Sequence, residues 1–271
     1  MTAITAPAPA VRTLQGSPIT RAVRDALTVA DRNLITYRRV PQLLVFSTIQ
    51  PVIFVLMFRY VFGGVVSTAL TVPYVDFLMP GIFVQTVVFG AIGTGIGLAT
   101  DVQSGLLERF RSLPMARSAV LAGRTLADLA RNVFVALLMV AVGFAVGFRV
   151  HTGALQLVAG MLLVLLFGYA LAWVFATVGL LTGDPETAQA AAFPVLAPLV
   201  FASSAFIPVR TMPGWLQAFA NHQPVSITAN AVRALVLGGP TASYVLQCLA
   251  WCAGIVAVFG PLAVRRYRRA L

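Results

Sequence analysis

The sequence contains no lysine, so all 19 of its basic residues are arginines. A P-loop ATPase uses a lysine in its phosphate-binding loop, and these 271 residues therefore hold no Walker A site. No serine stands in a GxSxG elbow, and the two histidines and two cysteines form no cluster with metal-ligand spacing. These absences exclude P-loop ATP hydrolysis within these residues and argue against an enzyme.

Charged residues are also scarce. They make up 10% of the sequence, whereas a soluble domain carries about 25%. Hydrophobic residues make up 59%, and the mean hydropathy is +0.90. A soluble fold of this length could not bury so much apolar surface, so the composition predicts an all-α integral membrane protein.

The few cysteines and histidines have structural explanations. Cys248 and Cys252 lie one helical turn apart in an apolar stretch, where a disulfide would strain the helix, so we expect small packing residues. His151 and His222 lie in predicted external loops, which is typical of polar interfacial residues rather than of a catalytic base.

Six apolar runs are each long enough to cross a bilayer, which takes about 20 residues. The expected spans are 41–62, 75–100, 124–148, 155–181, 188–208 and 242–263. The fifth is the least regular, because Pro194 and Pro198 lie inside it. Neighbouring helices can satisfy the carbonyls that such prolines free.

The placement of the arginines predicts the orientation. Segments 1–40, 101–131 and 264–271 hold fifteen of the 19 arginines, and arginine-rich loops stay in the cytoplasm. Both termini are therefore expected on the cytoplasmic side of the cell membrane. The exclusive use of arginine hints at a bacterial source. The net charge of +11 could suggest nucleic acid binding. Because the arginines lie between apolar runs, we expect them to contact lipid headgroups instead, with no nucleic acid partner.

The chain divides into three predicted parts. Residues 1–19 are rich in Ala, Pro and Thr and lack an apolar core, which indicates a disordered cytoplasmic tail rather than a signal peptide. Residues 20–40 place apolar side chains on one face and charged ones on the other, as an amphipathic interfacial helix does; a soluble surface helix would share this pattern. Residues 41–271 form the six-span domain.

Small and charged residues mark the second and third spans. Gly90, Gly93 and Gly97 line one side of the second and favour close helix packing. Arg124, Asp128 and Arg131 form a charge ladder at the start of the third, which lowers the cost of burying charge near the interface. No acid lies near the middle of a span, which argues against an ion-coupled carrier.

The longest external connection is residues 209–241. Pro213 and Pro224 each open an apolar run within it, as proline does at the first position of a helix. We therefore expect a re-entrant hairpin of two short helices that dip into the outer leaflet; a plain amphipathic loop is the alternative.

A short charged stretch, "DVQSGLLERFRSLPMAR" (residues 101–117), separates the second and third spans on the cytoplasmic side. In a helix, its apolar residues would form a stripe on one face and its charged residues would lie off that stripe. Pro114 would end this helix. This pattern predicts a brief amphipathic helix parallel to the membrane. Composition alone explains it equally well as a retention signal or as a docking surface.

The same region carries a family resemblance. "ERFRSLPMARSAVLAGRTLADLARN" (108–132) closely resembles the hallmark of ABC-2 type transporter permeases, specifically the daunorubicin-resistance (DrrB-like) subfamily. Three later stretches fit the same family: "VGFR" (146–149), "GDPETAQA" (183–190) and "FASSAFIPVRTMPGWLQAFANHQPVS" (201–226). The resemblance covers roughly residues 20–268.

The resemblance implies a six-span permease that pairs with a separate ATP-binding subunit and with a second permease chain, identical or related. The complex would export an amphipathic drug or a lipid-like substrate. ATP and Mg²⁺ would be used by the ATP-binding subunit, and this chain would bind no cofactor. The helix at 20–40 would be a connecting helix beside that subunit.

The resemblance also implies roles for individual residues. The residues expected to contact the ATP-binding subunit are Glu108, Arg109, Phe110, Arg111, Leu113, Pro114, Arg117, Asp184 and Glu186. Those expected at the external gate are Trp215, Asn221 and Gln223. Uncharged helices should line the substrate cavity, and its expected wall residues are Phe46, Gln50, Phe54, Gln85 and Phe89.

Two other functions stay open at this point: an ion-coupled secondary multidrug carrier and a non-transporting membrane scaffold. Transport that an uncoupler abolishes would favour the carrier. A scaffold would not stimulate ATP hydrolysis when cargo is added.

Overall fold

The computed structural model describes residues 42–67, 70–105 and 117–269, which are helical apart from turns and short connections. In chain order the elements are α2 (Gln42–Met57), η1 (Phe58–Phe62), α3 (Gly63–Ser67), α4 (Tyr74–Gln103), α6 (Arg117–Ala145), α7 (Ala154–Thr182), α8 (Pro185–Phe201), η2 (Val209–Thr211), α9 (Gly214–His222), α10 (Pro224–Leu237) and α11 (Thr241–Arg269). The expected tail at 1–19 and the expected interfacial helix at 20–40 lie outside the described residues.

Four helices of the described chain are long and apolar enough to cross a membrane. They are Tyr74–Gln103, Arg124–Ala145, Ala154–Thr182 and Thr241–Tyr267. These segments coincide with the second, third, fourth and sixth predicted spans. The prediction of an all-α, multi-pass membrane protein is therefore confirmed.

The first and fifth predicted spans correspond to shorter helices. Residues 42–67 form one helical run, in which α2, the π-helical turn η1 and α3 follow without a break, and its apolar part is Ser47–Phe62. α8 ends at Phe201, before the predicted boundary at 208. After the end of α8, the Ser203 hydroxyl donates a hydrogen bond to the Val200 carbonyl and accepts one from the Ala205 N–H. In a continued helix, both of these backbone groups would pair with other backbone groups.

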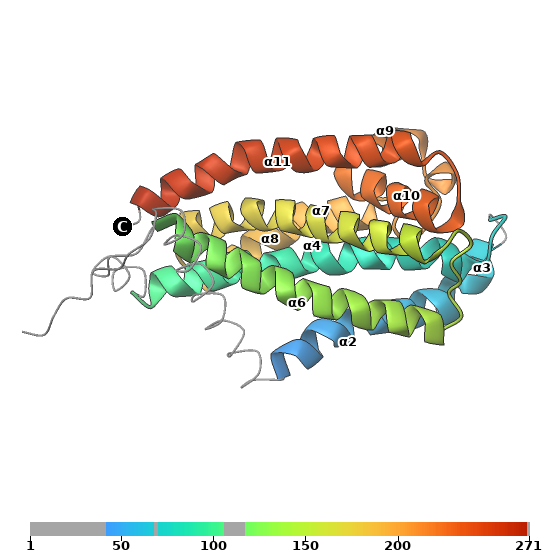
Figure 1. The fold of residues 1–271 in the computed structure, drawn as a ribbon, viewed down its shortest axis with the longest axis horizontal. Helices are drawn as coiled ribbons and strands as arrows, with labels where there is room; N and C mark the ends of the chain where they lie inside the picture. Colours follow the sequence, from blue (N-terminus) through green and yellow to red (C-terminus); the bar gives the residue numbers. More distant parts are fainter. Residues whose placement is uncertain (1–41, 68–69, 106–116, 270–271) are drawn as a thin grey trace, which may run out of the picture.

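Figure 1 shows a bundle of long helices, with α11 along one flank, α6 and α2 along the other, and α4, α7 and α8 between them. α3, α9 and α10 gather at one end, which we call the outer end after the orientation that the arginines predict. At the opposite, inner end lie the ends of α4, α7 and α11 and the beginnings of α6 and α8.

α4 is the central helix of the bundle. In an apolar stretch of 18 residues of α4, 67% of the residues are buried, against 22% in the corresponding stretch of α11. α4 packs most extensively on α7. The two backbones touch where Gly95 meets Gly179, since a Cβ added at Gly179 would lie 2.1 Å from the Gly95 carbonyl oxygen. Small residues of this kind are what lets membrane helices approach so closely.

The two short helices expected in residues 209–241 are present as α9 and α10. Pro213 precedes α9, and Pro224 opens α10, as the sequence predicted. α10 packs on α4, α7 and α11, so the hairpin is part of the bundle rather than a loop above it.

An aromatic cluster joins the first helical run to the segment after α8. The rings of Phe58 and Phe206 stack with their centroids 4.3 Å apart. Phe54 lies 5.9 Å from each of them. One of the expected cavity residues, Phe54, therefore packs in this cluster.

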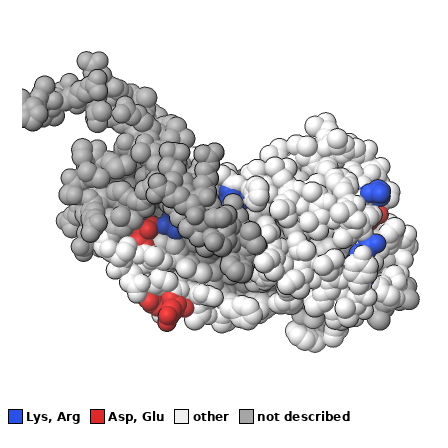
Figure 2. All heavy atoms as spheres, turned by 90° about the horizontal axis from the view of Figure 1, so that it is seen from below, with Lys and Arg blue, Asp and Glu red and all other residues white. Residues whose placement is uncertain are grey.

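The surface agrees with a lipid environment. On the face in Figure 2, charged atoms form a few small groups, and a wide uncharged region separates those toward the two ends. Large apolar side chains are exposed along the helices, among them Leu137, Leu162 and Val258. In a membrane such side chains contact acyl chains rather than water.

Candidate functional site

The inner halves of α4 and α6 meet along a polar contact. A Cβ added at Gly97 would lie 1.5 Å from Arg124 Nη2, and one added at Gly93 would lie 2.7 Å from Arg131 Nη1. The glycine stripe of one helix and the charge ladder of the next therefore face each other. The glycines leave the room that two long basic side chains occupy between the helices.

Three polar contacts follow one another along this surface, which we call the inner seam. They are the ion pair Arg124–Asp101, the hydrogen bond from Thr94 Oγ1 to Asp128 Oδ2 (2.7 Å) and the hydrogen bond from Arg131 Nη2 to the Gly90 carbonyl (2.6 Å). Each contact joins α4 to α6. Polar groups at this depth are costly unless they are paired, so the pairing stabilises the two helices against each other.

The inner seam brackets the predicted docking segment. α4 ends at Gln103 and α6 begins at Arg117, so the seam connects the helix that enters residues 106–116 with the one that leaves them. Six expected coupling residues lie outside the described residues: Glu108, Arg109, Phe110, Arg111, Leu113 and Pro114. Arg117 is the first residue of α6, and its side chain is also outside what is described.

The second expected contact, the turn before α8, lies at the same end. Gly183 has φ +65°, a left-handed conformation that glycine adopts without strain. Asp184 then caps α8 by accepting hydrogen bonds of 2.7 Å from both the hydroxyl and the N–H of Thr187, and these lower the pKa of its carboxyl. Gln103 donates to Asp184 at 3.2 Å and ties the turn to α4. Glu186, two residues after Asp184, is exposed.

A small polar cavity lies beside the inner seam, between α2, α4 and α6. It has a volume of about 120 Å³, and its lining includes Gln50, Gln85, Thr86, Phe89, Arg131 and Asn132. Three of the expected wall residues, Gln50, Gln85 and Phe89, thus meet at one cavity. Gln85 is only 1% exposed, and its Oε1 atom has no hydrogen-bond partner in the described part of the chain. Such an acceptor suits a ligand that donates a hydrogen bond.

The cavity differs from the expectation in one respect: its wall carries a charge. Arg131 reaches it from α6, next to the Asn132 amide. Sequence reasoning assigned Arg131 to the charge ladder alone and overlooked Asn132 and Thr86, although polar residues inside an apolar span are a known signal of function. The side chain of Phe46 lies outside what is described.

At the outer end one arginine is buried. Arg233 of α10 is 8% exposed, and each of its five N–H donors has an acceptor. The acceptors are the carbonyls of Phe77, Ser204 and Ala205, the Ser204 hydroxyl and the Asn230 side-chain oxygen. Phe77 belongs to α4, and Ser204 follows α8. One side chain therefore ties the hairpin to both helices.

The three expected gate residues do not form one cluster. Trp215 is 76% exposed at the beginning of α9, and Asn221 is exposed near its end. Gln223 is 4% exposed, because its side chain accepts from the Val225 N–H at 3.1 Å and donates to the Leu199 carbonyl at 2.9 Å. Gln223 caps α10 and does not face an opening in this structure.

Comparison with known proteins decides the family. Residues 24–237 match the ABC-2 type transporter family. The chain belongs to this family. It is 40% identical over 249 residues to the daunorubicin resistance ABC transporter permease protein DrrB1 of Streptomyces coeruleorubidus, covering 91% of this chain and 87% of the relative.

Two relatives from Mycobacterium tuberculosis are also similar to this ABC-2 permease. The probable doxorubicin resistance permease DrrC is 31% identical over 83% of this chain and 81% of its own length. The doxorubicin resistance permease DrrB is 31% identical over 82% of this chain and 84% of its own length. These matches confirm the prediction of an ABC transporter permease subunit.

α4 of the ABC-2 permease carries polar contacts near both of its ends. α4 carries Asp101 at the inner seam and Phe77 at the Arg233 site, close to its two ends. α4 therefore contacts both the inner seam and α10 of the hairpin.

Proposed function

We propose that this permease forms the transmembrane pathway of an ATP-driven exporter for an amphipathic drug. The printed names of the most similar relatives refer to daunorubicin and doxorubicin resistance. The observation that carries the proposal is the inner seam, because it couples the two helices on either side of the predicted docking segment. A lipid-like molecule is the second class of cargo that an apolar pathway could take.

The proposed topology has six spans with both termini in the cytoplasm of a bacterial cell. The run 42–67 serves as the first span, since its length of about 39 Å exceeds the roughly 30 Å hydrocarbon core. α8 serves as the fifth span with about 26 Å, and the turn after Phe201 completes the crossing. The predominance of arginine at the inner segments supports this orientation.

The proposed partner at the inner end is a separate ATP-binding subunit, which would use ATP and Mg²⁺. Residues 106–116 would dock on it, with the Arg109 and Arg111 guanidiniums facing acidic groups and Phe110 filling a groove. The capped turn with Asp184 and Glu186 would make the second contact. The hydrogen bond from Gln103 to Asp184 supports this, because it joins the second contact to the helix that enters the first.

The proposed mechanism is the transfer of motion through α4 and α6. ATP binding would draw two ATP-binding subunits together and displace the docked segments. The ion pair Arg124–Asp101 and the two hydrogen bonds beyond it keep the helices from separating, so both would tilt as one body. A pathway between two permease chains would then change from inward to outward access.

The proposed cargo contact is the polar cavity. Its volume of about 120 Å³ is below the roughly 300–1,000 Å³ of a site for a whole drug-sized ligand. The cavity would therefore hold only a polar end of the molecule, with Gln85 Oε1 accepting and Arg131 donating a hydrogen bond. Trp215 and Asn221 would lie along the exit at the outer end.

The test uses the permease co-purified with its ATP-binding subunit and reconstituted in liposomes. We expect ATP-dependent daunorubicin transport that an uncoupler does not affect. The Glu108→Ala/Arg109→Ala variant should insert normally but lose drug-stimulated ATP hydrolysis. Arg210→Ala, which removes an exposed arginine at the outer end, is the matched control and should keep it.

Two results would contradict the proposal. Uphill transport by the permease alone on a proton or sodium gradient would identify an ion-coupled carrier. Normal drug-stimulated hydrolysis in the Glu108→Ala/Arg109→Ala variant would remove the docking role from residues 106–116.

A further inference from the structure

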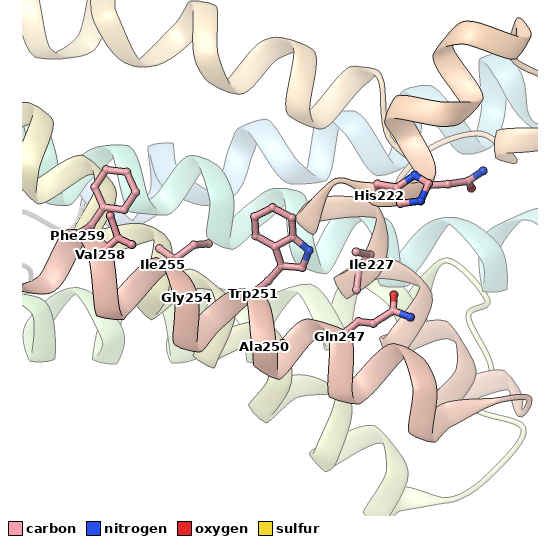
Figure 3. A pocket seen from close by; sticks show the side chains of 10 residues that line it. His222, Ile227, Gln247, Ala250, Trp251, Gly254, Ile255, Val258 and Phe259 are labelled. Carbon is pink, nitrogen blue, oxygen red and sulfur yellow. The ribbon is translucent and has the colours of Figure 1, made fainter.

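A long apolar groove runs along α11 beneath the external hairpin, apart from the inner seam and the polar cavity. It has a volume of about 690 Å³. Its lining includes Asn221, His222, Ile227, Gln247, Trp251 and Val258. Figure 3 shows that the labelled side chains of α11 project toward one side of the helix, where α9 and α10 overhang its outer part.

The polarity of this groove changes along its length. Its labelled polar side chains, His222 and Gln247, lie toward the outer part, where α9 approaches α11 (Figure 3), and Asn221 of α9 also belongs to the lining. Beyond Trp251 the lining residues are Gly254, Ile255, Val258 and Phe259, which are all apolar. The groove therefore has a polar head and an apolar body, as a membrane lipid does.

The length of the groove matches one leaflet. From Gln247 to Phe259 the helix advances about 18 Å at 1.5 Å per residue. Half of the hydrocarbon core measures about 15 Å. Since the predicted span is 242–263, the groove begins about five residues inside the outer end of the span and extends past its middle.

The groove is open toward lipid. α11 is the least buried of the four candidate spans, with 22% of its apolar window buried. Val258 is 62% exposed and Trp251 is 42% exposed. An unfilled groove would forfeit the dispersion contacts of its lining, so a flexible hydrocarbon chain that follows its shape stabilises this surface.

We propose that the groove binds one phospholipid of the outer leaflet. An acyl chain lies along Gly254, Ile255 and Phe259, and the Asn221 and Gln247 side-chain amides donate hydrogen bonds to the phosphate or ester oxygens. Neither amide has a hydrogen-bond partner within the described residues. The assignment to the outer leaflet rests on the proposed orientation.

The bound lipid would have a structural consequence. It would touch both α11 and the hairpin, because Asn221 belongs to α9, Ile227 to α10 and Trp251 to α11. The lipid would therefore add a contact between α9 and the last span, to which α10 is already joined through residues 238–240.

Gly254 offers a clean test, because no atom lies within 4 Å of a Cβ added there. Gly254→Leu fills the groove without a clash inside the protein. Gly260→Leu is the matched control on the same helix, since Gly260 lies outside the groove lining and its Cβ would meet only Val256 at 3.9 Å. The full permease is extracted from phosphatidylethanolamine–phosphatidylglycerol nanodiscs, and retained phospholipid is counted by native mass spectrometry.

We expect the wild-type chain and Gly260→Leu to retain one phospholipid more than Gly254→Leu. The retention of that lipid should fall about tenfold in Gly254→Leu, equivalent to about 1.4 kcal/mol of binding free energy. Equal retention by all three chains would overturn the proposal. This measurement needs no ATP-binding subunit, so its outcome is independent of whether the permease exports a drug.

A second measurement places the lipid at the groove. The chain has three tryptophans, and the Trp173→Phe/Trp215→Phe variant leaves Trp251 as its fluorophore. Brominated phospholipid should quench Trp251, and the quenching should survive detergent dilution in this background but not after Gly254→Leu. Loss of the quenching on adding daunorubicin would identify a drug site instead. Loss on increasing protein concentration would identify an interface with a second copy.

Discussion

Arg233 of α10 lies over the ring of Phe77 in α4, with its guanidinium carbon 3.8 Å from the ring centroid. The same side chain donates to the Phe77 carbonyl at 2.8 Å. The hairpin is therefore attached to α4 by a cation that is buried without a carboxylate among its described hydrogen-bond partners. Among the described residues, its charge is offset by carbonyl, amide and hydroxyl oxygens and by the face of the Phe77 ring.

Replacing this arginine should destabilise the outer end of the permease. Arg233→Leu removes all five donors of this network, and leaving a buried acceptor unpaired costs about 1–3 kcal/mol. We expect a clear fall in the thermal unfolding temperature of the purified permease. Arg210→Leu removes an exposed arginine of the same end and should change it little; equal falls in both variants would show that the Arg233 network does not stabilise the fold.

The ion pair of the inner seam should behave as a coupled pair. Asp101→Asn and Arg124→Gln should each lower drug-stimulated ATP hydrolysis, and the double variant should be no worse than the more severe single one. Both side chains keep some contact with solvent, at 17% and 19% exposed, so we expect a coupling free energy of about 1 kcal/mol in unfolding. Strictly additive effects would mean that the two residues act separately.

Gln85 separates a ligand role from a structural one. A buried acceptor without a partner costs about 1–3 kcal/mol of stability. Gln85→Leu removes this acceptor, so the variant should be at least as stable as the wild type. Its transport rate should nevertheless fall, because the polar cavity loses its acceptor. Gln156→Leu, at an exposed position of α7, is the control. A variant that is more stable and transports at the normal rate would exclude Gln85 from the cargo path.

The cap on α8 predicts a pH dependence. The pKa of Asp184 is lowered by the hydrogen bonds from Thr187, so its contribution to stability is complete above the ordinary carboxyl pKa and is lost as the pH falls through the lowered value. We expect Asp184→Ala to unfold at a lower temperature than the wild type at neutral pH. The difference should shrink in strong acid; a difference that is constant down to acid pH would contradict the role of the charge.

The sequence predicted the class of fold and most of its helices, because apolar runs and proline starts are local signals. It also identified the glycine stripe of α4 and the charge ladder of α6 separately. It could not show that Gly97 faces Arg124, since the rotation of one helix against another depends on all their side chains together. The sequence therefore gives the parts of the inner seam but not the contact.

The missed residues have a common physical cause. Arg233 is one external arginine among others in the sequence, and only the packing of α10 on α4 makes it a buried centre of hydrogen bonds. The family resemblance implied a place for Gln223 at the external gate, whereas its side chain caps the beginning of α10. In both cases long-range packing decides the role of a side chain whose local pattern is ordinary.

The contact of Gly95 with Gly179 has a mechanical consequence. Because the two backbones touch there, a tilt of α4 against α7 would pivot about that contact. The inner arm, to Gln103, is about 12 Å long, and the outer arm, to Tyr74, is about 31 Å long. Such a tilt would displace the outer end of α4 about two and a half times as far as its inner end. A modest movement of a nucleotide-driven partner would then open a passage at the far side of the membrane.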